Sequence, residues 1–308
     1  MPRLKTQAAK DRLLRRVRRQ RLKYITVLPS LMTILNGACG FAAIVLASKG
    51  ATARVGQSSC LAIAGYMILL AMIADMLDGR LARMSQSTSS FGGQLDSLCD
   101  IISFGVAPAF LMLKVLEYKL GFADLNVTFE SFMQRFIWLA AAAYISCAAI
   151  RLARFNVENE EDESAHMSFI GLPTPAAAGV IVSLVIFHQQ TLPLLADQNI
   201  KAYHLCENAI IYALPFLLLA VAVLMVSRIR YPHILNQYIK GKKPFAHLLW
   251  LLLGLGVVVW NIQVALVLIF CGFAANGFAK WFYYRVHILQ RIAGNHQNPQ
   301  KEQSYPVN

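Results

Sequence analysis

The chain has 308 residues, of which 57% are hydrophobic and only 15% are charged, and its mean hydropathy is +0.50. This composition excludes an ordinary soluble domain and predicts an all-α membrane protein with several spans. The net charge of +13 does not indicate a nucleic-acid partner, because ten of the 29 lysines and arginines lie within residues 1–24 and read as a membrane-topology signal.

Residues 1–24 form a basic juxtamembrane segment that contains a single acid, Asp11. Apolar side chains recur among its arginines, at Leu13, Leu14, Val17 and Leu22. The pattern predicts an amphipathic helix that lies on anionic lipid. At the least, the positive charge is expected to keep the N-terminus in the cytoplasm.

Apolar stretches in residues 25–285 predict a single transmembrane domain of about eight helices. They lie at 26–48, 58–83, 92–117, 133–155, 173–195, 207–227, 246–260 and 262–283. The seventh stretch is short and only Asn261 separates it from the eighth, so one long kinked helix, giving seven spans, is the alternative. Residues 286–308 are polar and predict a disordered tail.

The distribution of basic residues decides between these arrangements. Basic segments occur at 1–24, 80–91 and 228–243 and in the tail from Lys280, and eight spans place all four on one side. The positive-inside rule therefore predicts that both termini face the cytoplasm. Residues 158–163 are acidic instead, but acids contribute little to orientation, and the sequence assigns this loop no role.

Four aspartates stand at the ends of the second and third predicted spans. Asp75 and Asp78 are three residues apart, and Asp96 and Asp100 are four apart, so each pair shares one helix face. Two antiparallel helices would bring the four carboxylates together. Such a cluster needs cations to stay ionised, and hard divalent ions prefer oxygen ligands. The sequence predicts bound Mg²⁺ or Mn²⁺ at a site that is unusual inside a membrane and therefore functional.

Gly79, Ala82, Arg83 and Gly92 complete a pattern of eight fixed positions from Asp75 to Asp100. The pattern resembles the signature D-x2-D-G-x2-A-R-x8-G-x3-D-x3-D of the CDP-alcohol phosphatidyltransferase family. The resemblance implies two metal ions held by Asp75, Asp78 and Asp96. It also implies that Asp100 is a ligand or the base that deprotonates the acceptor alcohol, so that Asp96 and Asp100 are the expected catalytic residues.

The same resemblance implies that the nucleotide of a CDP-activated lipid lies against the end of the second span. Gly79 and Ala82 carry no bulky side chain, so a nucleotide can approach the helix backbone there, and Arg83 can donate to a phosphate. Thr33 and Asn36 on the first span are expected to contribute to the site for the CDP moiety.

Further segments are similar to the membrane-integral phosphatidylserine synthase branch of this family. They are Leu28-Pro29-Ser30, Ser103 to Ala109, Arg151 to Asn156, Gly171 to Ala177 and Ser227 to Pro232. Ser30 departs from the asparagine usual in that branch. The resemblance implies CDP-diacylglycerol and L-serine as substrates, membrane lipids as surroundings and a homodimer.

Arg151 and Arg154 lie three residues apart near the end of the fourth predicted span. A planar guanidinium suits the carboxylate of serine. The same pair would also attract a phosphorylated acceptor, and its alternative role is to reach the membrane interface.

The leading prediction is a serine transferase in the bacterial inner membrane with its site facing the cytoplasm, and two other functions are alternatives. A phosphatidylglycerophosphate or phosphatidylinositol-phosphate synthase would use the same chemistry on a phosphorylated acceptor. A divalent-cation transporter would need acids near mid-membrane, whereas these aspartates lie toward span ends. The choices between Mg²⁺ and Mn²⁺, and between acyl and ether lipid, stay open.

Overall fold

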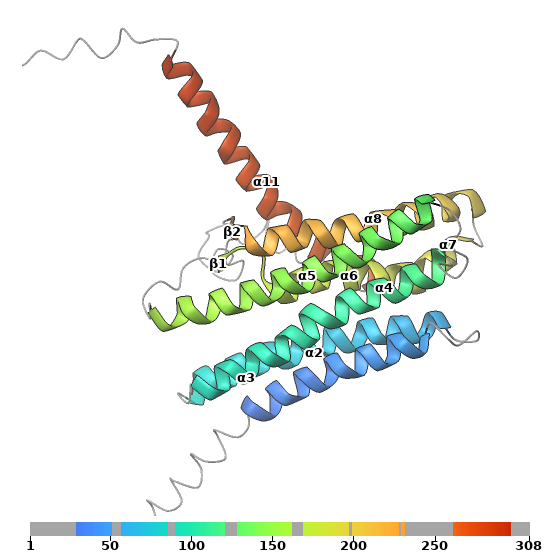
Figure 1. The fold of residues 1–308 in the computed structure, drawn as a ribbon, viewed down its shortest axis with the longest axis horizontal. Coiled ribbons are helices and arrows are strands. Elements are labelled where there is room, and N and C mark those ends of the chain that lie inside the picture. Colours follow the sequence, from blue (N-terminus) through green and yellow to red (C-terminus); the bar gives the residue numbers. More distant parts are fainter. Residues whose placement is uncertain are drawn as a thin grey trace, which may run out of the picture.

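The computed structural model describes residues 29–50, 57–85, 90–120, 128–161, 169–196, 199–227, 229–231 and 261–296. Within these residues it contains seven helices that are long and apolar enough to cross a membrane, which confirms the all-α membrane fold (Figure 1). The predicted N-terminal helix at 1–24 and the predicted seventh span at 246–260 lie outside the described residues.

The bundle is built from the helices that the structure describes. In chain order they are Pro29–Gly50, α2 (Gln57–Ser85), α3 (Ser90–Asp100), η1 (Ile101–Val106), α4 (Ala107–Leu120), α5 (Thr128–Glu161), α6 (Thr174–Ile186), η2 (Phe187–Thr191), α7 (Leu192–Ala196), α8 (Ile200–Val226) and α11 (Ile262–His296). The π-helical segments η1 and η2 each lie inside a continuous span, which is where such segments usually occur.

Small residues fill the contacts between the helices, while large apolar residues face outward. Alanines are buried along the first helix, α2, α5 and α6, among them Ala43, Ala64, Ala141 and Ala178. Large apolar side chains such as Leu139 are exposed. This distribution is typical of a membrane bundle, because close helix packing replaces the hydrophobic effect and lipid covers the outer surface.

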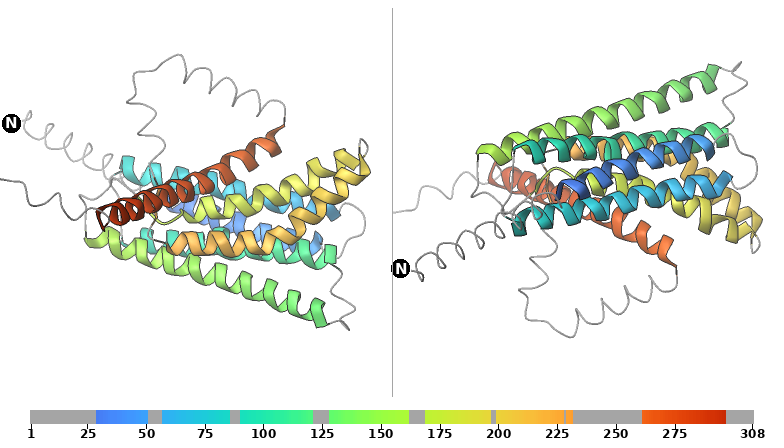
Figure 2. Two further views of the ribbon diagram at one scale, coloured as in Figure 1. Left: turned by 90° about the horizontal axis from the view of Figure 1, so that it is seen from above. Right: turned by 90° about the horizontal axis from the view of Figure 1, so that it is seen from below.

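The bundle has two chemically different ends. We name the end that contains Asp75, Asp78 and Asp96 the carboxylate end, and the opposite end, which contains Lys119 and Glu207, the far end. Both views in Figure 2 show the helices running lengthwise between these ends, with the short α7 at the far end.

The direction of α11 bears on the number of spans. The side chain of Gln263, at its start, donates to Gln190 at 2.8 Å and to Tyr66 at 3.3 Å, both at the far end. The helix then runs toward the carboxylate end, where it contacts β2 (Figure 2). α8 also runs from the far end toward the carboxylate end, so the two helices share the same sense, although α11 slopes away from the bundle in Figure 1. The eight-span prediction requires this order, whereas seven alternating spans would reverse α11.

The sixth span begins earlier than the sequence predicted. The predicted start is residue 207, but α8 begins at Ile200, and the side chain of Asn199 caps it by accepting from the backbone N–H groups of Lys201 and Ala202. Polar residues lower the hydropathy of this first part, so a hydropathy-based prediction starts the helix too late, although Tyr203 and Glu207 are paired within the bundle.

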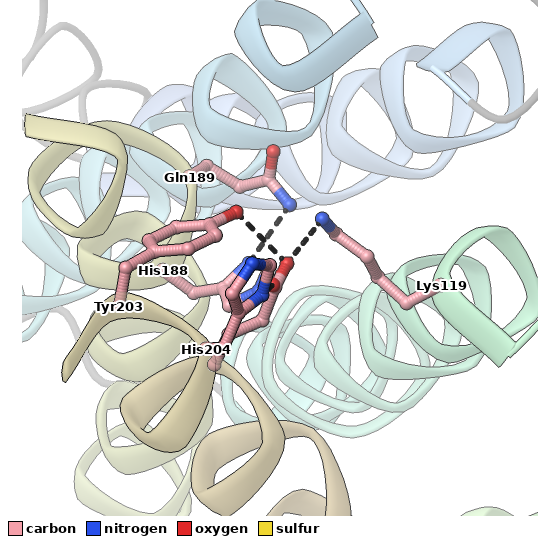
Figure 3. A network of polar contacts seen from close by, with 6 residues as sticks. Lys119, His188, Gln189, Tyr203 and His204 are labelled. Carbon is pink, nitrogen blue, oxygen red and sulfur yellow. Dashed lines mark hydrogen bonds and ion pairs between the residues drawn. The ribbon is translucent and has the colours of Figure 1, made fainter. Parts of the chain in front are cut away.

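Figure 3 shows the polar network that pairs them, with Lys119, His188, Gln189, Tyr203 and His204 around one carboxylate. That carboxylate is Glu207, which forms an ion pair with Lys119 and accepts from the Tyr203 hydroxyl at 3.0 Å. His188 is buried within this network. The network joins α4, η2 and α8 and leaves the Glu207 carboxylate well paired.

Two short strands close the carboxylate end. β1 (Phe169–Ile170) pairs antiparallel with β2 (Arg230–Tyr231), with Ile170 opposite Arg230. The backbone N–H of Gly171 then donates to the Ile229 carbonyl at 2.8 Å. The following helix α6 begins after Pro173, as expected for a proline at a helix start.

Two helices extend further than predicted. α5 continues to Glu161, so the first part of the acidic segment 158–163 is helical, in keeping with the helix propensity of glutamate. α11 continues to His296, which makes the first part of the predicted polar tail helical.

The backbone conformation at residue 171 requires a glycine. Its φ is +83°, and a Cβ atom at this position would lie 2.3 Å from the Met225 carbonyl oxygen. We therefore expect Gly171→Ala to lower the free energy of unfolding by about 1–3 kcal/mol. Gly272→Ala is the matched control, because nothing lies within 4 Å of its Cβ position. Thermal unfolding of both variants in detergent measures the difference, and equal melting temperatures would contradict the strain at Gly171.

Candidate active site

The end of α2 and the middle of α3 bring three aspartates together. Asp75 and Asp78 stand one turn apart on α2, and Asp96 faces them from α3. Each offers one carboxylate oxygen, and the three oxygens lie within 4.8 Å of one another. We name this group the aspartate triad. Separations of this size allow all three oxygens to bind a common cation.

The hydrogen bonding of the triad is incomplete. Asp78 Oδ2 and Asp96 Oδ1 are both buried and have no hydrogen-bond partner among the described residues. A buried carboxylate oxygen without a partner is costly, so such atoms call for a bound ion or ligand. Because hard divalent cations prefer carboxylate oxygens, the donor set of the triad fits Mg²⁺ or Mn²⁺.

Asp100 is near the triad but is held differently. It is buried, with 7% of its surface exposed, and lies close enough to interact electrostatically with Asp75, Asp78 and Asp96. Its Oδ1 atom accepts a hydrogen bond of 2.8 Å from the side chain of Asn36. The structure therefore brings three of the four predicted carboxylates into one cluster and places the fourth beside it.

The first helix passes close to this cluster. The Thr33 hydroxyl donates to the Pro29 carbonyl at 3.1 Å, and the Thr33 side chain also contacts the Asp78 carboxylate. Two turns later, a Cβ atom at Gly40 would lie 2.7 Å from the Cα atom of Ser103. The absence of a side chain at Gly40 therefore lets the first helix approach η1 closely enough for Thr33 and Asn36 to reach the aspartates.

The predicted nucleotide-binding residues follow the triad on α2. Gly79 and Ala82 are half-buried, and the backbone N–H of Gly79 bonds to the Asp78 carboxylate. Arg83 belongs to the same helix, but its side chain lies outside the described part of the structure. The structure thus places the small residues of the motif directly beside the triad.

α5 brings the two predicted serine-binding arginines to the same end. Arg151 is buried, with 9% of its surface exposed, and Arg154 is half-buried. Their helix is tied to α3 by Asn156, whose amide donates to the Ser97 hydroxyl at 2.9 Å and accepts from it at 3.2 Å. Ser97 is the neighbour of Asp96 in the chain, so this contact links the arginine-bearing helix to the triad.

Sequence reasoning missed two contacts of this site. The Ser97–Asn156 and Asn36–Asp100 pairs join residues 59 and 64 positions apart. All four residues belong to segments that the sequence singled out, but periodicity within one helix cannot predict which residues of two helices meet.

Comparison with known proteins agrees with this geometry. Residues 26–231, about two thirds of the chain, match the CDP-alcohol phosphatidyltransferase family. The chain belongs to this family. The match ends at Tyr231, the last residue of β2, so it includes the aspartates, the arginines and both strands.

Relatives occur in bacteria, in archaea and in the yeast Saccharomyces cerevisiae. A CDP-diacylglycerol–serine O-phosphatidyltransferase of Helicobacter pylori is 32% identical over 74% of this chain and 83% of its own length. One of Methanocaldococcus jannaschii is 31% identical, over 70% of this chain and 79% of its own. An archaetidylserine synthase of Methanothermobacter thermautotrophicus is 30% identical, over 67% and 70% respectively.

The triad leads to a binding prediction that does not depend on turnover. Asp96→Asn removes a charge from the cluster, so we expect the affinity for Mn²⁺ to fall at least about tenfold. A loss of about tenfold is the smallest usually seen when a residue that only supports a metal ligand is mutated. Glu117→Gln is the control, because Glu117 is an exposed carboxylate paired with Lys114 on α4. Calorimetric titration of Mn²⁺ measures both. Unchanged affinity in Asp96→Asn would remove Asp96 from the metal site.

Proposed function

We propose that this chain transfers the phosphatidyl group of CDP-diacylglycerol to the hydroxyl of L-serine, giving phosphatidylserine and CMP. The observation that carries the proposal is the aspartate triad at the end of an apolar bundle. The reaction needs a site that grips a pyrophosphate at the membrane surface. The serine acceptor is supported by the names of the relatives from bacteria and archaea.

We propose that Asp75, Asp78 and Asp96 hold the divalent cations, Mg²⁺ or Mn²⁺, with two ions at the site and Asp100 beside the second. Bound divalent ions neutralise phosphate oxygens and stabilise both the entering and the leaving oxygen of a displacement at phosphorus. The two buried carboxylate oxygens, which have no partner in the described part of the chain, support this arrangement.

The CDP moiety is proposed to lie along the end of α2. Gly79 and Ala82 leave the helix backbone accessible to it, Arg83 donates to a phosphate oxygen, and Thr33 closes the site from the first helix. The contact between Thr33 and Asp78 supports this placement, because it puts the first helix beside the same carboxylates.

Asp100 is proposed to accept the proton of the serine hydroxyl. The serine oxygen then forms a bond to the phosphorus of the diacylglycerol phosphate, and the bond between that phosphorus and the CMP oxygen breaks. CMP leaves with the electron pair. A general base of this kind contributes about 10²–10⁴ in rate.

Arg151 and Arg154 are proposed to bind the carboxylate of serine. A guanidinium can make two parallel hydrogen bonds to a carboxylate, which fixes the orientation of the amino acid. The Asn156–Ser97 contact supports this role, since it holds the helix of both arginines against the helix of Asp96.

We further propose that the carboxylate end faces the cytoplasm of a bacterial inner membrane and that the chain forms a homodimer. The first helix starts, and α11 ends, on the side of the bundle that holds the triad. The basic segment 1–24 and the basic tail from Lys280 then fall on one side, as the positive-inside rule requires.

An acceptor panel with the purified protein tests the function. CDP-diacylglycerol is supplied with L-serine, glycerol 3-phosphate or inositol phosphate, each with Mg²⁺, with Mn²⁺ or with EDTA. We expect phosphatidylserine as the product, and none in EDTA. Transfer to a phosphorylated acceptor would overturn the choice of serine. No product with any acceptor, together with metal uptake into proteoliposomes, would favour a transporter.

Arg154→Ala tests the serine site. Losing a charged hydrogen bond costs about 1.5–3 kcal/mol, so we expect KM for serine to rise roughly ten- to a hundredfold with little change in KM for CDP-diacylglycerol. Arg135→Ala is the matched control, because Arg135 is exposed near the start of the same helix. Initial rates at varied serine measure both. An unchanged serine KM in Arg154→Ala would show that this arginine only reaches the membrane interface.

A further inference from the structure

We infer that Asn36 is a positioning residue for Asp100 rather than a contact for the nucleotide. The inference rests on the proposed role of Asp100 in the transfer. Asn36 has none of its surface exposed, and its side-chain amide donates to Asp100 Oδ1 at 2.8 Å. A bound nucleotide could therefore not reach this amide unless the helices moved apart.

The hydrogen bond determines how the amide is oriented. A carboxylate can only accept, so the NH₂ group of Asn36 has to face Asp100. The opposite atom, Asn36 Oδ1, is then left buried without a partner among the described residues. This orientation gives Asp100 a hydrogen bond while the Asn36 oxygen lacks one in the described structure. We expect such an arrangement for a residue whose role is to hold the carboxylate.

The helix that carries Asn36 is itself anchored to the helix that carries Asp100. The hydroxyl of Ser103 donates to the backbone carbonyl of Asn36 at 2.8 Å, and Gly40 allows close contact with Ser103 one turn further on. Ser103 belongs to η1, which directly follows Asp100. The backbone at Asn36 is therefore held against the segment that follows Asp100.

This geometry gives the two oxygens of Asp100 different environments. Oδ1 is bound to Asn36, which fixes the plane of the carboxylate and leaves Oδ2 for the serine proton. A carboxylate that rotates freely beside three other acids would point this oxygen toward the acceptor only part of the time. Asn36 thereby raises the fraction of productive orientations, and the loss should appear in kcat.

Asn36→Leu is the sharpest test, because leucine has a similar shape and cannot donate. We expect kcat to fall about 10- to 100-fold, the usual loss when a residue that orients an active-site group is removed. KM for CDP-diacylglycerol should stay within about twofold of the wild type, since substrate contacts are unchanged. Asn208→Leu is the matched control, because it makes the same change at an exposed position on α8, and it should keep nearly the full kcat.

A double-mutant cycle checks that Asn36 acts through Asp100. In the Asp100→Asn background, Asn36→Leu should cost little more, because the group it positions has already lost its function. Retained titration of CDP-diacylglycerol with Mn²⁺ shows that each variant is folded. If Asn36→Leu does not fold, Asn36→Ser, which keeps a donor, should retain more kcat than Asn36→Ala.

Contrary results separate the two proposals. A raised KM for CDP-diacylglycerol with unchanged kcat would make Asn36 a nucleotide contact and overturn this inference alone. Equal losses for Asn36→Leu in both backgrounds would also overturn it. If the wild-type protein itself made no phosphatidylserine in the same experiment, the proposed function would fail.

Discussion

The repulsion between carboxylates in an apolar bundle shapes the whole carboxylate end. Three carboxylate oxygens of Asp75, Asp78 and Asp96 lie within 4.8 Å of one another. At an effective dielectric constant of about 20, each ionised pair at this separation repels by about 3 kcal/mol or more. The three carboxylates can all stay ionised only if cations offset this cost, so the cluster favours a bound metal ion.

The two ends of the bundle meet the cost of buried charge in different ways. At the far end, Glu207 is paired with Lys119 and accepts from Tyr203, so its charge is balanced by the protein itself. At the carboxylate end, Asp78 and Asp96 keep buried oxygens without partners in the described structure. The first arrangement holds helices together, and the second leaves carboxylate oxygens that could bind an ion.

The sequence predicted the features that depend on one helix at a time. The spacing of Asp75, Asp78 and Asp96 placed them on facing surfaces, and hydropathy found the described spans, as helix geometry and burial require. It did not predict that α8 begins at Ile200, because hydropathy cannot show that Glu207 is paired with Lys119 on α4. Nor did it predict the bond from Asn36 to Asp100, which depends on how two helices are aligned.

The residues of the site could be predicted from the sequence, although the alignment of their helices could not. A motif fixes which residue types occur along one or two helices, and the family likeness assigns them roles. The contacts made by the first helix and by α5 come from close packing, at Gly40 against Ser103 and at Asn156 against Ser97. Packing of this kind depends on the whole bundle, and no local pattern encodes it.

The central claim is that the aspartate triad holds a divalent ion, and anomalous X-ray scattering from crystals grown with Mn²⁺ tests it most directly. The account predicts an anomalous peak within about 2.0–2.6 Å of carboxylate oxygens from Asp75, Asp78 and Asp96, the range for hard divalent ions. A peak elsewhere in the molecule, or none at saturating Mn²⁺, would contradict it.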